Sequence, residues 1–160
     1  MSFGKIQATQ FDLARNAAYQ AGQVKLFASK LSGGLNELLN SDHPVEAWGT
    51  SSTLDDDGTT LHITTPFGRA RGVAVVHLSD GSIRARYVFE KLVASISGDP
   101  VYRPVWAVHI SGDGQVSSED RELIYRNQSI SGSERANGVA TVALSAIYAI
   151  ASDEGYYVDS

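Results

Sequence analysis

The sequence predicts an α+β protein: an antiparallel β-meander with two C-terminal helices packing on one face, and a further helix near the N-terminus. Residues 59–111 alternate apolar and polar side chains in runs that Gly, Pro and Asp turn signals separate. Residues 9–40 and 139–152 carry apolar side chains at helical spacing. The length of 160 residues fits one domain, and the absence of cysteine excludes disulfides and thiolate sites.

The N-terminal segment, residues 1–44, contains the first expected helix. Its apolar positions recur every three or four residues, at Phe11, Ala14, Ala18, Ala21, Val24, Phe27, Ala28 and Leu31. Glycines at 22, 33 and 34 weaken this interpretation, so extended structure in part of residues 9–40 stays an alternative.

The sheet is expected within residues 45–111. The predicted strands cover residues 48–54, 60–65, 69–78, 83–91 and 102–110. Acidic and glycine turn residues at 55–58, Pro66-Phe67-Gly68, Asp80-Gly81 and a loop at 94–100 separate them.

Two helices are expected within residues 117–152. Ser117 is placed to cap the first helix, with Asp120 in its first turn, and this helix would continue to Asn127. The second covers residues 139–152 and is apolar almost all round, so other elements must cover it on most sides. In so small a chain, we expect a second subunit to provide part of that cover.

A two-residue Asp80-Gly81 turn fixes which side chains share a face of the sheet. It pairs Ser79 with Ser82, His77 with Arg84, Val75 with Arg86 and Arg71 with Glu90. The preceding turn aligns Thr64 with Arg69 and His62 with Arg71. One face is then apolar, with Leu61, Ile63, Ala70, Ala74, Val76, Leu78, Ile83, Ala85, Tyr87, Phe89, Trp106, Val108 and Ile110.

The opposite face gathers basic and polar side chains, which are the candidate RNA-binding residues Arg69, Arg71, Arg84, Arg86, Arg103, His62, Thr64, His77 and His109. Net charge is −5 overall, yet residues 59–111 hold six basic and three acidic residues. Arginine forms bidentate contacts with phosphate and stacks on bases, so this face favours a nucleic acid or another phosphate ligand. An ordinary solvated sheet face is the alternative.

Other motifs give weaker indications. Three histidines are followed two residues later by Ser or Thr, as in two-histidine phosphoesterases, although the expected βαβ repeat is absent. Residues 109–120 imitate part of an EF-hand loop, but His109 stands where the first ligand belongs. The acidic run at 55–57 fits a solvated turn. We therefore expect no metal and no cofactor, and no apolar stretch is long enough to span a membrane.

Residues 83–126, IRARYVFEKLVASISGDPVYRPVWAVHISGDGQVSSEDRELIYR, carry a resemblance to a known family. A basic alternating strand leads through a loop to a second alternating strand, a glycine turn and a Ser/Asp/Glu segment. With the apolar segment at 139–152, this order resembles the coat proteins of single-stranded RNA bacteriophages, the levivirus-like family. The resemblance covers residues 69–150, and the helical N-terminal segment departs from the family's β-hairpin.

The resemblance implies a structural protein rather than an enzyme. It implies an interlocked homodimer, assembly of dimers into an icosahedral shell, and genomic single-stranded RNA on the sheet face that lines the shell. The implied location is the virion, with assembly in the host bacterial cytoplasm. A small two-histidine phosphoesterase and a small protein-interaction module are the alternatives.

Overall fold

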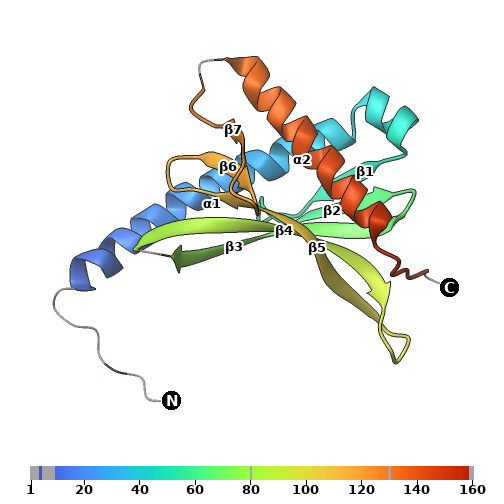
Figure 1. Ribbon diagram of the computed structural model, residues 1–160, viewed down its shortest axis with the longest axis horizontal. Coiled ribbons are helices and arrows are strands. Elements are labelled where there is room, and N and C mark those ends of the chain that lie inside the picture. Colours follow the sequence, from blue (N-terminus) through green and yellow to red (C-terminus); the bar gives the residue numbers. More distant parts are fainter. Residues whose placement is uncertain (1–3, 5–9, 80, 130, 159–160) are drawn as a thin grey trace.

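Each strand pairs antiparallel with the strand before it, so seven strands form one sheet in chain order. The structure is a computed structural model that describes residues 4, 10–79, 81–129 and 131–158. Two long helices lie on one face of the sheet, which we call the covered face; no described element lies on the other, the bare face (Figure 1). The predicted α+β class is therefore confirmed.

The elements in chain order are α1 (Phe11–Leu39), the π-helical turn η2 (Pro44–Trp48), β1 (Ser51–Leu54), β2 (Leu61–Thr65), β3 (Gly68–Ser79), β4 (Ser82–Ala94), β5 (Pro100–Ile110), β6 (Gln115–Ser118), β7 (Leu123–Arg126) and α2 (Gly132–Ser152).

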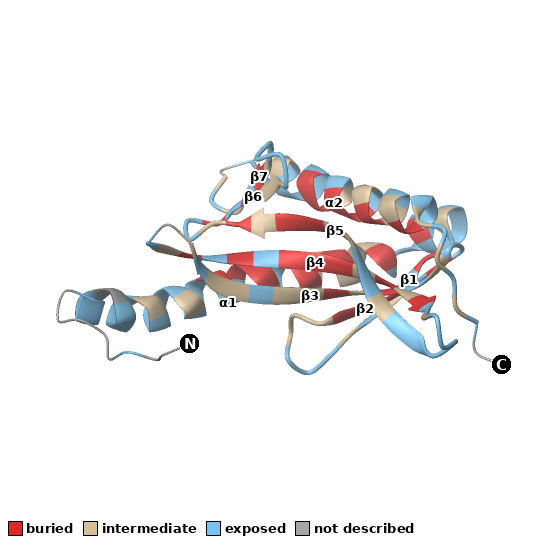
Figure 2. Ribbon diagram, turned by 60° about the horizontal axis from the view of Figure 1, so that its bottom comes forward, coloured by how far each residue is buried: buried red, intermediate tan, exposed pale blue. Residues whose placement is uncertain are grey.

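The N-terminal helix is present where the apolar spacing predicted it. α1 runs from Phe11 to Leu39, and Thr9, at the start of the predicted range, lies outside the described residues. Its C-terminal half buries Val24, Ala28 and Leu31 at helical spacing against the sheet. Its N-terminal half extends past the sheet (Figure 2).

The predicted register of the central strands is confirmed. His77 pairs with Arg84 and Arg71 with Glu90 between β3 and β4, and His62 pairs with Arg71 between β2 and β3. The apolar set predicted from this register lies on the covered face, where Leu61, Tyr87 and Phe89 are fully buried. Leu78 is the exception, because it is 52% exposed near the end of β3.

The predicted helix at 117–127 is wrong, since these residues form the β6–β7 hairpin. Val116 pairs with Tyr125, and both side chains are buried in the core on the covered face, where α2 packs against β7. The Ser-Ser-Glu-Asp sequence that was expected to cap a helix instead enters a tight turn, in which the Ser118 N–H donates to Glu122 O over 2.9 Å. One C-terminal helix therefore packs on the sheet, not two.

Two further boundaries differ from expectation. The strand expected at 48–54 is shorter, because the turn of η2 ends at Trp48 and Gly49 has φ +67°, so β1 begins only at Ser51. α2 begins at Gly132, seven residues before the predicted start. It crosses β7 at Gly138, where a Cβ would lie 2.4 Å from the Cβ of Tyr125, so only glycine permits this close approach.

Candidate nucleic-acid interface

The bare face carries its side chains in rows that run across the strands. Basic residues occupy rows in two groups, with Arg69 and Arg71 of β3 in one group and Arg84 and Arg86 of β4 in the other. An apolar row lies between them, made by the paired residues Val73, Val88 and Ala107. The basic residues therefore form two clusters rather than one continuous patch.

The first cluster centres on Arg71. Its Nε donates to Glu90 Oε1 over 2.7 Å, and its guanidinium lies 3.9 Å from the centroid of the Tyr102 ring. Both contacts restrain this side chain, and the exposed plane of a stacked guanidinium suits a nucleobase. Arg69 and Thr64 pair beside it, and both are exposed.

The second cluster contains an acidic residue that the sequence did not place on this face. Glu119, at the tip of the β6–β7 hairpin, accepts from Arg86 Nη2 at 2.6 Å and from Arg86 Nε at 3.0 Å. Its second oxygen lies 3.0 Å from His109 Nε2. The hydrogen bond from Arg86, with a smaller contribution from His109, holds the pKa of Glu119 below its usual value against the opposing effect of burial.

Arg84 and His77 pair with each other at the end of the β3–β4 hairpin. Arg84 is exposed, and its side chain contacts only Ser82 Oγ, at 3.4 Å, with no carboxylate partner among the described residues. Of the predicted arginines, Arg84 therefore offers the guanidinium most available to an anion.

His62 also has an acidic neighbour on the bare face. Its Nε2 lies 3.0 Å from Asp55 Oδ2, in the loop that follows β1. Asp55, Glu90 and Glu119 together face the four arginines on this side of the sheet. Three carboxylates therefore lie on this face, and its positive charge is smaller than the sequence indicated.

Arg103 does not lie on the predicted face. Phe89 pairs with Trp106 but Glu90 pairs with Pro104, so Val105 is the extra residue of a β-bulge. The extra residue exchanges the faces occupied by the β5 side chains that precede it in the sequence. This places Arg103 on the covered face, where it forms an ion pair with Asp153 after α2. The same reversal brings Tyr102 to the bare face.

The histidines are too widely spaced for the phosphoesterase alternative to use His62 and His77 together. His62 pairs with Arg71, and Arg71 precedes His77 by six residues on β3. At about 3.3 Å per residue this separates the two positions by roughly 20 Å along the strand. One phosphate group cannot contact both.

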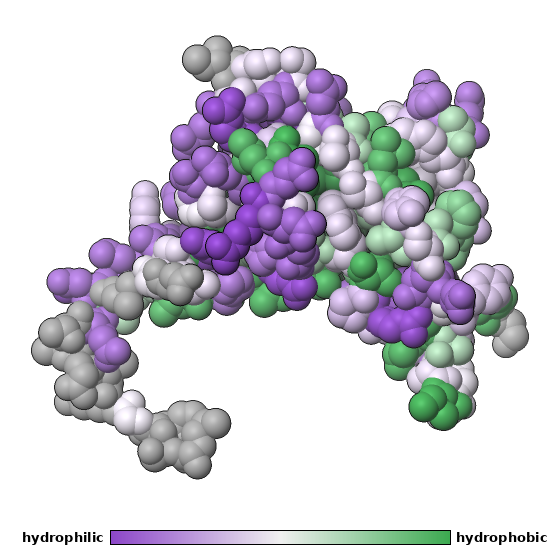
Figure 3. Space-filling model, in the orientation of Figure 1, coloured by the Kyte–Doolittle hydropathy of each residue, from purple (hydrophilic) through white to green (hydrophobic). Residues whose placement is uncertain are grey.

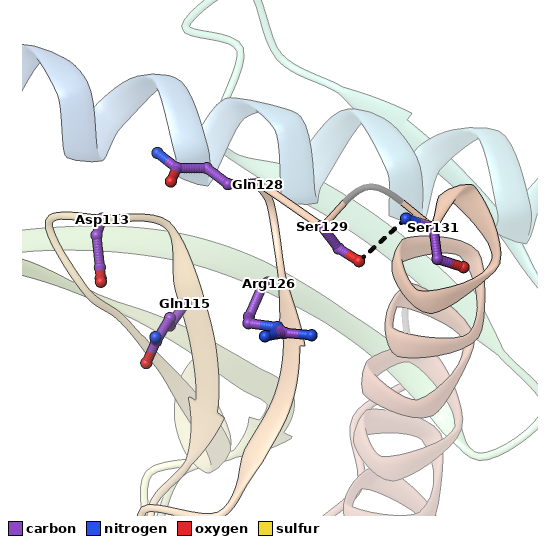
Figure 4. A pocket seen from close by; sticks show the side chains of 6 residues that line it. All are labelled: Asp113, Gln115, Arg126, Gln128, Ser129 and Ser131. Atoms are coloured by element: carbon purple, nitrogen blue, oxygen red, sulfur yellow. Dashed lines mark hydrogen bonds between the residues drawn. The ribbon is translucent and has the colours of Figure 1, made fainter.

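A hollow lies away from the candidate site, between the β6–β7 hairpin and the start of α2. Its volume is about 510 Å³, and its lining side chains include Asp113, Gln115 and Arg126 (Figure 4). Arg126 also donates to Glu134 Oε1 over 3.0 Å. Figure 3 shows hydrophilic surface over this hairpin and a hydrophobic end on the projecting β4–β5 hairpin, where Ile96 is fully exposed.

Among the described residues, neither long helix is apolar enough over eighteen positions to cross a membrane, and no cluster of three or more His, Asp or Glu side chains could hold a metal ion. Comparisons with protein families, curated proteins and solved structures find no match to this chain.

Proposed function

We propose that this chain is a structural, RNA-binding coat protein of the single-stranded RNA phage type, in which the bare sheet face binds single-stranded RNA. One observation carries the proposal: both helices pack on one face, while Arg69, Arg71, Arg84 and Arg86 project from the other, in two clusters on either side of an apolar row. A shell protein needs such a division, because one broad surface must stay open to the enclosed nucleic acid.

The spacing of the arginines supports contact with a flexible polyanion. Arg84 and Arg86 lie two residues apart on β4, about 6.6–6.8 Å along the strand. Sequence-independent RNA binding depends on several guanidiniums that contact successive phosphates, together with flat groups on which bases stack. The Arg71–Tyr102 pair supplies such a flat group on the same face.

The carboxylates on the bare face do not exclude this function. Glu119 and its partner Arg86 are each more than two-fifths exposed, and such solvent-exposed ion pairs contribute only about 0.2–1 kcal/mol. A phosphate can therefore replace Glu119 at little cost. We infer that RNA binding is moderate in strength and strongly dependent on salt.

The decisive experiment removes the two β4 arginines together. Arg84→Ala with Arg86→Ala should weaken binding of single-stranded RNA and lower the slope of log K against log salt by about 1.4, since each lost phosphate contact removes about 0.7. Both side chains are exposed on the bare face, so the variant should fold normally, as circular dichroism would verify.

A matched control removes the same charge elsewhere. Lys30→Ala with Arg135→Ala takes two exposed cations from α1 and α2, on the covered side, and should leave the salt slope unchanged. An unaltered slope in the β4 double variant would mean that the bare face is only a solvated surface. The shell itself is tested by the mass of the purified protein, which should reach the megadalton range and appear as particles in negative-stain micrographs.

A further inference from the structure

His109 and Arg86 form a cross-strand pair in the second cluster of the bare face, and Glu119 contacts both side chains. Arg86 binds one oxygen of the carboxylate through Nε and Nη2, and His109 Nε2 lies 3.0 Å from the other oxygen. The phosphate contact proposed for Arg86 does not involve this histidine. A ring that can gain a charge near neutral pH therefore lies directly beside a proposed phosphate contact.

Glu119 determines which ring nitrogen of His109 carries the proton. A carboxylate only accepts hydrogen bonds, so Nε2 must donate to Glu119 Oε2. The hydrogen bond from Arg86 holds the pKa of Glu119 below its usual value, so the carboxylate stays ionised in the range where histidine titrates. In the neutral ring the single proton is therefore on Nε2, and Nδ1 is an acceptor.

The other ring nitrogen is the one that responds to pH. Nδ1 of His109 has no hydrogen-bond partner among the described residues, and the side chain is 32% exposed. As an acceptor, Nδ1 repels a phosphate oxygen. Protonation of the ring places an N–H there and adds a positive charge to the bare face, so the same atom then binds phosphate.

The charged groups that face His109 come from two elements. Arg86 lies opposite it on β4, with Arg84 two residues before, and Glu119 follows β6. β6 places the neutral Ser117 opposite His109. The β6–β7 turn also contains three exposed charged residues that form no hydrogen bond or ion pair with His109, namely Asp120, Arg121 and Glu122. Neither of the two groups that contact the Glu119–Arg86–His109 set from within it changes charge over the histidine range, so His109 is its titrating member.

Arg86 has a donor left for the same phosphate. Its Nε and Nη2 bind Glu119 Oε1, whereas Nη1 has no hydrogen-bond partner in the described part of the chain. Directly paired residues of antiparallel strands have Cα atoms about 4.5–5.5 Å apart, and their side chains share a face. One phosphate is therefore within reach of both Arg86 and His109, while Glu119 keeps its own contacts.

We propose that Arg86 and His109 form one phosphate subsite, in which His109 Nδ1 is a donor only when the ring is protonated. RNA then binds the bare face more tightly as pH falls through the range in which histidine titrates. By linkage, RNA binding takes up protons at this subsite. The inference rests on the proposed function, because it requires a phosphate of RNA on the bare face.

Fluorescence anisotropy with a labelled uridine homopolymer tests the proposal at about pH 8 and about pH 5, the limits of the histidine range. Uridine bases do not titrate between these limits, so a change in affinity reports the protein. His109→Gln keeps an amide N–H that can donate to Glu119 but cannot take up a proton. The two proteins should bind equally at the higher pH, and the wild type about 1.4- to 5-fold more tightly at the lower pH, the range for one exposed ion pair.

Two further histidine variants serve as controls. His43→Gln removes a ring that contacts Trp48 before β1, and should leave the pH dependence of RNA binding unchanged. His62→Gln is the closer match, because His62 lies on the bare face with Nε2 3.0 Å from Asp55. Its paired arginine, Arg71, instead donates to Glu90 on β4 and stacks on Tyr102, so this variant should reduce the pH dependence less than His109→Gln.

Calorimetry measures the proton uptake directly. Titration of the same RNA into the protein in two buffers of different ionisation enthalpy gives the number of protons bound with the RNA. Near pH 6.5, about the midpoint of histidine titration, uptake should be larger in the wild type than in His109→Gln. Circular dichroism at each pH verifies that both proteins are folded.

The contrary results separate this inference from the proposed function. Equal pH dependence and equal proton uptake in the wild type and His109→Gln would overturn the subsite, while RNA binding with the expected salt slope would leave the proposed function intact. A loss in His62→Gln as large as that in His109→Gln would also overturn it, because any added charge on the bare face would then suffice. Absence of RNA binding at both pH values would refute the proposed function together with the subsite.

Discussion

The two faces of the sheet both carry cations, but the cations have different partners. On the covered face Lys91 is 3% exposed, and its Nζ donates to Ile150 O at 2.8 Å and to Asp153 O at 2.6 Å. On the bare face Arg86 binds a carboxylate that is 43% exposed. A buried ammonium on backbone carbonyls fixes the end of a helix, whereas an exposed ion pair can exchange its carboxylate for a phosphate.

The β-bulge at Val105 decides which face receives which residue. Without the extra residue, Arg103 would join the bare face and Tyr102 the covered one. With it, Arg103 binds Asp153 at the end of α2, and Tyr102 stacks under Arg71. The comparison shows that the role of a basic residue in this sheet depends on register more than on residue type.

The largest effect should come from the closest contact on the covered face. Gly138→Ala places a Cβ about 2.4 Å from the ring and Cβ of Tyr125, so α2 must shift away from β7. We expect a loss of about 2–3 kcal/mol in the free energy of unfolding, measured by urea denaturation. Gly132→Ala, where nothing lies within 4 Å, should be neutral or slightly stabilising, and an equal loss there would show that the contact is not the cause.

The second prediction removes the buried ammonium. Lys91→Met keeps the apolar stem but leaves the two carbonyls of Ile150 and Asp153 without their donor, which should cost about 2 kcal/mol of stability. Arg84→Met removes a cation from the bare face of the same strand and should change stability by less than about 0.5 kcal/mol. An equal loss of unfolding free energy in the two variants would mean that the buried cation on the covered face stabilises the fold no more than the exposed cation on the bare face.

The third prediction uses pH to examine the same helix end. Burial acts to raise the pKa of Asp153, but hydrogen bonds from Arg103 and the Gly155 N–H outweigh it and hold that pKa below 3.8. A carboxyl with a lowered pKa stabilises the fold at higher pH, and the stabilisation is lost as pH falls through the folded-state pKa. Asp153→Asn should therefore cost about 1 kcal/mol near pH 7 and progressively less below pH 3.8. A penalty independent of pH would exclude the ionic contribution.

A variant of the other partner in this ion pair tests whether Arg103 belongs to the RNA site. Arg103→Ala should lower stability by up to about 1 kcal/mol through loss of the Asp153 pair, and leave RNA binding unchanged. Weaker RNA binding with unchanged stability would instead support the sequence-based prediction that Arg103 binds RNA.

Strict alternation explains why much of the sheet could be predicted from the sequence. Asp80-Gly81 set the β3–β4 register, and every pair from Arg71–Glu90 to Ser79–Ser82 follows from a two-residue turn. The bulge at Val105 has no comparable local signal, since Val-Tyr-Arg-Pro-Val-Trp fits either phase. Pro104, inside the predicted strand, was the one sequence feature that indicated a bulge, because proline in sheets is often found at bulges and edges.

The β6–β7 hairpin was missed for a different reason. Its Ser-Ser-Glu-Asp turn contains the residues that also begin helices, and four-residue strands are too short to show a period. Val116, Ile124 and Tyr125 indicated a strand conformation instead of a helix, because β-branched and aromatic residues favour strands. Missing this hairpin also concealed Glu119, because only the hairpin turn brings that carboxylate beside Arg86 and His109.

The fourth prediction concerns this carboxylate on the bare face. Glu119→Gln leaves a neutral side chain of the same size and frees the charge of Arg86 for phosphate. The gain is limited to the energy of one exposed ion pair, about 0.2–1 kcal/mol, or roughly a 1.4- to 5-fold increase in RNA affinity. Glu134→Gln, on α2, is the matched control, and fluorescence anisotropy at fixed salt measures both. Weaker binding by Glu119→Gln would mean that the carboxylate organises the site rather than competing with RNA.

The smallest effect should come from the turn that carries Glu119. Arg121 has φ +65° and is the only non-glycine residue with positive φ in the described part of the chain. It ends a three-residue hairpin loop at the position where glycine is favoured, because a Cβ is strained there. Arg121→Gly should relieve this strain, and after the entropy that glycine adds to the unfolded chain we expect a net gain of about 0.5 kcal/mol. Arg121→Ala removes the same charge but keeps the strained Cβ, so it should give no gain. If both variants were equally stable, the positive φ at residue 121 would not affect the stability of the fold. The position of Glu119 beside Arg86 would then depend on their ion pair alone.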